Sequence, residues 1–144
     1  MNTMAIVEVE EVTIEVCEPS DNAHVIYTAR RLAVQAGFDE IKQVLIATAA
    51  SELSTNILRY ALKGTITIKI IQDRNRAAIE LIALDKGPGI GNIDQAMQEH
   101  FSTGNGLGLG LSSVKRIMDE FTIQSKLNHG THIVARKWRT NAEN

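Results

Sequence analysis

Residues 101–121 read FSTGNGLGLGLSSVKRIMDEF. Glycine recurs there at every second position, at Gly104, Gly106, Gly108 and Gly110, and the chain then continues in an amphipathic helical pattern. Glycine has no Cβ, so such a backbone can turn its N–H groups toward an anion. The first amides of the following helix lack partners within the helix and also favour an anion. The stretch predicts a lid over a phosphate group, and a glycine-rich loop without a ligand is the alternative.

The composition is that of an ordinary globular protein. The chain has 144 residues, of which 44% are hydrophobic and 22% are charged, and this predicts a single domain over residues 1–144. A net charge of −2 gives no basic surplus, so a nucleic acid partner is not expected. No apolar run approaches the roughly 18 residues of a membrane span, so we expect no membrane association and a cytoplasmic protein.

A long helix is predicted from a cap at Asp39 to about Leu62. It carries three polar side chains on one side, because Glu52 and Asn56 are four residues apart and Arg59 follows three residues later. At 100° per residue this polar file lies at the edge of the buried face. The file indicates either a group of functional side chains or a solvent-exposed face on which Glu52 and Arg59 form an ion pair.

The rest of the chain contains both strand-like and helix-like segments. Alternating segments predict strands, and spacing by three and four residues predicts a further helix before Asp39 and another within the opening stretch. The expected strands cover residues 5–16, 65–72, 77–85, 121–127 and 131–138. Since residues 65–85 and 121–138 each read as a hairpin, the fold class is α+β.

The strand over residues 77–85 ends on a charge. Asp85 is followed at once by Lys-Gly-Pro-Gly, with glycines at Gly87 and Gly89. A carboxylate at the end of a buried strand can accept a hydrogen bond from a docked ligand, and the glycines let that ligand approach the backbone. A Gly-Pro turn capped by an aspartate is the alternative.

Several known sites are excluded. The chain contains no G-x-x-x-x-G-K-[ST], and neither glycine cluster forms G-x-G-x-x-G behind a strand, so neither a P-loop nor a Rossmann site is predicted. No H-R-D and D-F-G pair of the eukaryotic kinase type occurs. The four histidines show neither metal-ligand nor catalytic-triad spacing.

Taken together, four motifs resemble the GHKL ATP-binding superfamily of gyrase, Hsp90, MutL and sensor histidine kinases. They are ELSTN at 52–56, DKGPG at 85–89, the glycines from 104 to 110, and Gly130-Thr131. The residues within these motifs are most similar to those of the stand-alone serine/threonine switch kinases of the bacterial stressosome, the RsbT type. The resemblance implies the Bergerat fold, a two-layer α/β sandwich with helices on one face of a mixed, mostly antiparallel sheet.

The resemblance also implies roles for single residues. Asp85 would accept a hydrogen bond from the adenine amino group, with Thr131 beside it. Asn56 would hold magnesium through its side-chain oxygen, a hard ligand suited to that ion. Glu52 would be the general base, and Arg59 would contact a phosphate. The lid glycines would wrap the β and γ phosphates of ATP.

The function implied is transfer of the ATP γ-phosphate to serine or threonine on a STAS-domain partner, followed by activation of a PP2C-type phosphatase. One alternative is an anti-sigma factor of the same superfamily, whose kinase activity targets its own antagonist. A second alternative is a nucleotide-gated binding module without catalysis. The presence of a carboxylate at Glu52, in the place of the general base, disfavours this alternative. The chain has no histidine-bearing dimerisation helix, so histidine autophosphorylation is not expected.

Overall fold

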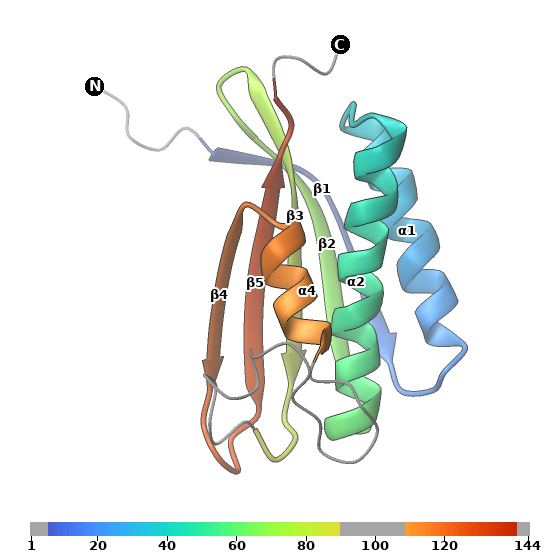
Figure 1. Cartoon of the computed structure of the whole chain (residues 1–144), viewed down its shortest axis with the longest axis vertical. Coiled ribbons are helices and arrows are strands. Elements are labelled where there is room, and N and C mark those ends of the chain that lie inside the picture. Colours follow the sequence, from blue (N-terminus) through green and yellow to red (C-terminus); the bar gives the residue numbers. More distant parts are fainter. Residues whose placement is uncertain (1–5, 90–108, 141–144) are drawn as a thin grey trace.

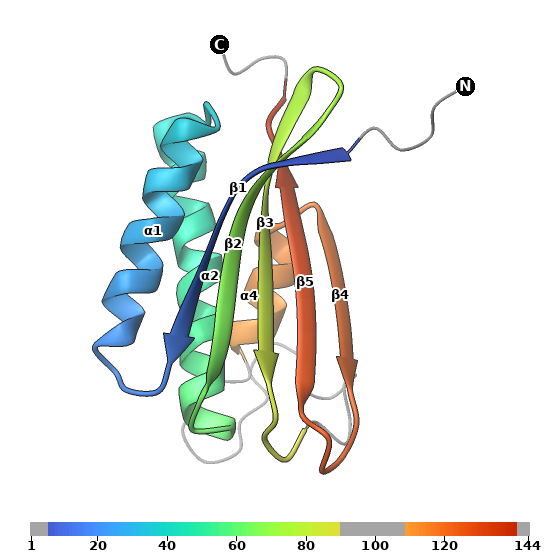
Figure 2. The ribbon, with the colours of Figure 1, turned by 180° about the vertical axis from the view of Figure 1, so that it is seen from behind.

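A computed structural model describes residues 6–89 and 109–140, which form two layers: a five-stranded sheet, and three helices on one of its faces (Figures 1 and 2). The elements are β1 (Ile6–Val16), α1 (Asp21–Gln35), α2 (Glu40–Tyr60), β2 (Gly64–Asp73), β3 (Arg76–Asp85), α4 (Leu109–Ile117), β4 (Glu120–Ser125) and β5 (Thr131–Trp138). None of the helices in these described ranges is long and apolar enough to cross a membrane. The predicted α+β sandwich with helices on one face is confirmed.

The strand order is β1-β2-β3-β5-β4, and all four neighbouring pairs are antiparallel. The resemblance had implied a mixed, mostly antiparallel sheet, and no parallel pair occurs among the described strands. The difference arises because β5 lies between β3 and β4, so the two strands that flank α4 and run in the same direction never pair (Figure 2). Likewise, two helices connect β1 to β2, and the chain returns antiparallel to β1.

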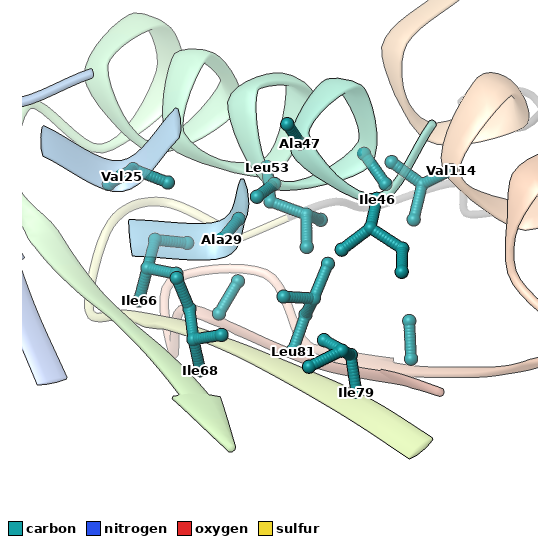
Figure 3. Close-up of a cluster of buried hydrophobic side chains, with 14 of the residues drawn as sticks. Val25, Ala29, Ile46, Ala47, Leu53, Ile66, Ile68, Ile79, Leu81 and Val114 are labelled. Atoms are coloured by element: carbon teal, nitrogen blue, oxygen red, sulfur yellow. The ribbon is translucent and has the colours of Figure 1, made fainter. Parts of the chain in front are cut away.

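The core lies between α2 and the sheet. The apolar side of α2 is buried, since Ile46, Ala50, Leu53 and Ile57 are at most 2% exposed. They pack with side chains from both layers of the fold, which include Val25 and Ala29 of α1, Ile66 and Ile68 of β2, Ile79 and Leu81 of β3, and Val114 of α4 (Figure 3). Burial of this kind stabilises by roughly 1.5–3 kcal/mol per large side chain, so α2 is anchored firmly.

The cap predicted at Asp39 is found in the structure, and β1 contains one irregularity of register. The side chain of Asp39 accepts a hydrogen bond from the backbone N–H of Lys42 at 2.9 Å, which caps the start of α2. The helix ends at Tyr60, and Leu62 then takes a left-handed conformation with φ of 72°. In β1 the register shifts between Glu8 and Glu10, where the alternation of the sequence slips.

The ends of several elements meet at one end of the molecule. The C-terminal ends of α2, β3 and β4 lie there, together with the first residues of α4 and β5, at the bottom of Figure 1. The polar residues singled out in the sequence lie on these ends.

Candidate nucleotide site

The polar file of α2 lies at the edge of the core. Glu52, Asn56 and Arg59 are each partly buried, whereas their neighbours Leu53 and Ile57 are buried against the sheet. Because the buried neighbours fix the rotation of the helix about its axis, they also fix the direction of the polar file. The expected position at the edge of the buried face is confirmed.

The first turn of α4 packs directly on this file. A Cβ built on Gly110 would lie 3.3 Å from Asn56 Oδ1 and 3.4 Å from Glu52 Oε2. Gly110 is buried, so a larger residue there would have to displace these two side chains. The absence of a side chain leaves a cradle in which a carboxylate oxygen and an amide oxygen lie side by side at the positive end of a helix.

Arg59 brings a positive charge to the same file. Its Nη1 is buried and has no hydrogen-bond partner within the ranges 6–89 and 109–140. A buried N–H of a guanidinium without an acceptor is costly, and a phosphate oxygen is an acceptor that suits it. The donors and acceptors of α2 could therefore hold a magnesium-bound phosphate group, for which Asn56 offers an oxygen ligand and Arg59 offers an N–H donor.

Asp85 belongs to a row of residues that crosses four strands. In the sheet register Gly64 of β2 pairs with Asp85 of β3, Asp85 pairs with Thr131 of β5, and Thr131 pairs with Ser125 of β4. Asp85 Oδ1 accepts the backbone N–H of Gly87 at 2.9 Å, so the carboxylate is held by the loop that follows it. The chain packs too closely at Gly64 for a side chain, because a Cβ there would lie 2.5 Å from the carbonyl oxygen of Leu84 and 3.0 Å from the Cβ of Asp85.

The loop after Asp85 is held between α2 and the β4–β5 hairpin. A Cβ on Gly87 would lie 2.5 Å from the Cβ of Ala61, which follows the last residue of α2. Gly89 has a φ of 76°, and the carbonyl of Pro88 accepts the N–H of Asn128 at 2.6 Å. The close packing on Ala61 explains why Gly87 has no side chain, and it fixes Asp85 relative to the file on α2.

Two open cavities adjoin these residues. One, of about 260 Å³, is a groove between α1 and α2, and it is lined by Ile26, Arg30, Val44, Ala47, Thr48, Ser51 and Glu52. The other, of about 280 Å³, lies at the ends of β3, β4 and β5, and its lining includes Asp85, Ser125 and Thr131. Glu52 thus lies both on the groove and in the cradle at Gly110.

The structure brings together most of the predicted site residues. Gly104, Gly106 and Gly108 lie outside the described residues, and of the four lid glycines only Gly110 can be placed. Sequence reasoning passed over Ser125, whose hydroxyl lies 2.8 Å from that of Thr131. The hairpin predicted over residues 121–138 was the available signal, because it brings the residues on either side of its turn, such as Ser125 and Thr131, opposite each other.

Known proteins match this fold and this chain. Residues 41–141 match the family described as histidine kinase-, DNA gyrase B-, and HSP90-like ATPase. The chain is 48% identical to the serine/threonine-protein kinase RsbT of Bacillus subtilis over 109 residues, which are 76% of this chain and 82% of that protein. It is 30% identical to the anti-sigma F factor of Clostridium beijerinckii over 135 residues, 88% of this chain and 93% of that one.

Among solved structures, the mycobacterial sensor histidine kinase MprB superimposes with a TM-score of 0.54 at 18% identity, over 89% of this chain and 95% of that one. This likeness concerns the fold. The matched family segment begins in α2 and runs beyond β5, and so it includes every predicted site residue. The chain therefore belongs to the histidine kinase-, DNA gyrase B-, and HSP90-like ATPase family.

Proposed function

We propose that this protein is a serine/threonine-protein kinase that transfers the γ-phosphate of ATP to a hydroxyl group on a partner protein. One observation carries the proposal: the carboxylate of Glu52 lies beside Asn56 in the cradle at Gly110 and also lines the open groove between α1 and α2. A group in that position is accessible from the nucleotide side and from the protein surface. The 48% identity to a serine/threonine-protein kinase supports the same activity.

ATP is the nucleotide, because the family is one of ATPases. In our proposal Asp85 accepts a hydrogen bond from the adenine amino group, and Thr131, its neighbour across the sheet, contacts the same edge of the base. Gly87 and Gly89 let the base approach the backbone. At the other end of the nucleotide, Arg59 and the lid glycines Gly104, Gly106, Gly108 and Gly110 contact the phosphates.

Asn56 would hold magnesium through Oδ1, which lies in the cradle at Gly110. When bound, the ion would neutralise charge on the β and γ phosphates. The contribution of this chain is to hold the amide oxygen in place, and α2 does so because its core residues prevent the helix from rotating. Arg59 adds a second positive charge three residues further along the file.

Glu52 would act as the general base. Its carboxylate takes the proton of the acceptor hydroxyl while the hydroxyl oxygen bonds to the γ-phosphorus and the bond to the β-phosphate oxygen breaks, which releases ADP. Such a transfer depends mainly on positioning and charge neutralisation. The acceptor hydroxyl would approach through the α1–α2 groove, since that groove leads to Glu52 from solvent.

The acceptor would be a STAS-domain protein of a stressosome pathway. A phosphoryl group adds about two negative charges, and it weakens an interface that offers no basic partner. Phosphorylation of the acceptor would then release the kinase, and the free kinase would activate a PP2C-type phosphatase. The exchange of one partner protein for the other would thus follow from the negative charge that phosphorylation adds to the acceptor.

A second candidate is an anti-sigma factor whose kinase activity targets its antagonist. The 30% identity over 135 residues to an anti-sigma F factor favours it. This candidate shares the chemistry of Glu52 and differs in the protein that is bound. Stable binding of a purified sigma factor in the presence of ATP would support it over the switch kinase.

The test is incubation of the purified protein with radiolabelled ATP, magnesium and purified STAS-domain candidates encoded near its gene. We expect label on serine or threonine of one candidate and no label on histidine of the protein itself. Binding of ATP without label on any candidate would contradict the kinase proposal and support a nucleotide-gated binding module. Label on a candidate that also competes with a sigma factor would favour the anti-sigma factor.

A further inference from the structure

We propose that Ser125 sets base specificity: it fixes the hydroxyl proton of Thr131 so that the sheet end at Asp85 and Thr131 offers only hydrogen-bond acceptors to a bound base. This inference rests on the proposed function, in which Asp85 and Thr131 contact the adenine. It adds a specificity residue that does not itself contact the base.

The three side chains share one face of the sheet. Asp85, Thr131 and Ser125 follow one another across β3, β5 and β4 in register. Two residues along each strand, Ala83, Ile133 and Ile123 belong to the core or pack against it. Side chains alternate between the faces of a strand, so the three polar residues face the helix layer too.

The hydrogen bonds of Ser125 determine where its proton lies. Its Oγ is 3.0 Å from the carbonyl oxygen of Gly130 and 2.8 Å from Oγ1 of Thr131. A hydroxyl has one proton and a carbonyl can only accept, so Ser125 donates to Gly130. In the second contact Thr131 must then be the donor. Its proton is directed at Ser125, and lone pairs are what it offers in other directions.

Asp85 offers lone pairs as well. Its carboxylate has no proton when ionised, and Oδ1 already accepts the N–H of Gly87 at 2.9 Å. Asp85 and Thr131 are directly opposite each other on neighbouring strands. A base with an exocyclic amino group brings two hydrogens to such a pair of acceptors. A base with a keto oxygen at the same place presents another acceptor to these acceptors, so no hydrogen bond forms and the lone pairs repel each other.

Without Ser125 the discrimination weakens. In Ser125→Ala the hydroxyl of Thr131 is free to rotate, and its proton can be donated to a keto oxygen. Sites that hydrogen-bond a polar group of their ligand reject analogues strongly when a polar atom is left unpaired. The affected quantity is the ratio of affinities for an amino and a keto base, whereas the general affinity for nucleotide changes less.

The experiment measures the dissociation constants of ATP and inosine triphosphate by calorimetry, since inosine has a keto oxygen where adenosine has the amino group. We expect Ser125→Ala to lower the preference for ATP by about tenfold, an amount typical of one misdirected hydrogen bond. Ser125→Thr keeps the hydroxyl and should restore the wild-type ratio. The matched control is Thr122→Val, which removes a hydroxyl of the same strand that contacts the carbonyl of Val134 at 3.5 Å.

An unchanged ratio in folded Ser125→Ala would overturn the inference. If Ser125→Ala does not fold, Ser125→Cys tests the same point, because a thiol of similar size is a weak donor. An equal fall in ratio for Thr122→Val would also overturn it, since the effect would then be structural. Failure of the proposed nucleotide site differs from failure of the inference about Ser125. In that case the wild-type protein would not bind ATP, or Asp85→Asn would bind ATP with the dissociation constant of the wild type.

Discussion

Gly110, the second residue of α4, lies directly against the carboxylate of Glu52 on α2. A Cβ on Gly110 would be 3.4 Å from Oε2 of Glu52 and 3.3 Å from Oδ1 of Asn56. The glycine-rich segment and the polar file are 58 positions apart between Gly110 and Glu52, yet α4 and α2 pack together and bring them into contact. The lid helix and the proposed base are therefore parts of one site.

This contact predicts the effect of Gly110→Ala. The new methyl group would push Glu52 and Asn56 by a few tenths of an ångström, and phosphoryl transfer is sensitive to such displacement, so we expect transfer to fall about tenfold. Alanine is favoured over glycine in a helix by about 1 kcal/mol, so the free energy of unfolding should not fall. Transfer assays and urea denaturation measure both. Ser113→Ala on the same helix is the control, and full activity of Gly110→Ala would contradict the contact's role.

Asp85→Asn should weaken ATP binding. The amide keeps an oxygen for the N–H of Gly87, so the loop stays in place, but the charge that accepts from the adenine amino group is lost. Hydrogen bonds to charged groups contribute about 1.5–3 kcal/mol, so the dissociation constant should rise about tenfold or more. Calorimetry measures it. Asp73→Asn is the same change at the opposite end of the β2–β3 pair, and it should leave the affinity for ATP unchanged. An affinity of Asp85→Asn for ATP equal to that of the wild type would refute the assignment to adenine.

Ile26→Asp should impair phosphorylation of the partner. Ile26 is 36% exposed and lines the groove that reaches Glu52, so an aspartate would put a negative charge where an apolar partner surface would dock. We expect kcat/KM for the partner to fall about tenfold, with the ATP affinity unchanged. The control is Val34→Asp, because Val34 is 57% exposed on the same helix and does not line the groove. Equal losses in both variants would contradict docking through the groove.

Ser54→Ala should stabilise the protein. Ser54 is 0% exposed on α2, and its hydroxyl has no hydrogen-bond partner within the part of the chain that the structure describes. Removing a buried, unpaired hydroxyl should raise the free energy of unfolding by about 1 kcal/mol, and alanine also favours the helix. Urea denaturation tests this.

Ser51→Ala provides the opposite case. Its hydroxyl bonds the side chain of Asn22 on α1 at 3.1 Å, so its removal should destabilise the protein by about 1 kcal/mol. A loss of stability in Ser54→Ala as large as in Ser51→Ala would show that the hydroxyl of Ser54 is satisfied.

Local signals predicted the elements of this fold well. The bounds of α2 followed from the cap at Asp39 and a helical period, and the polar file followed from the spacing of Glu52, Asn56 and Arg59. The two hairpins followed from turn residues between alternating segments. These features depend on neighbours in the chain, which the sequence displays directly.

Contacts between distant segments were less predictable. Periodicity does not say which strand β3 pairs with, so the insertion of β5 between β3 and β4 was missed. The packing of Gly87 on Ala61 depends on how α2 crosses the sheet. The resemblance indicated which residues share a site, and only the structure shows that Gly110 contacts Glu52 and that Ser125 contacts Thr131.

The most direct test of the account is Glu52→Gln, measured for ATP affinity and for phosphoryl transfer to the partner protein that the wild-type kinase phosphorylates. Glutamine keeps the size of the side chain and its place beside Gly110 but cannot accept the proton of the acceptor hydroxyl. We predict an unchanged dissociation constant for ATP and a transfer rate lower by about 10²–10⁴. Transfer at the wild-type rate, or loss of ATP binding in place of transfer, would contradict the account.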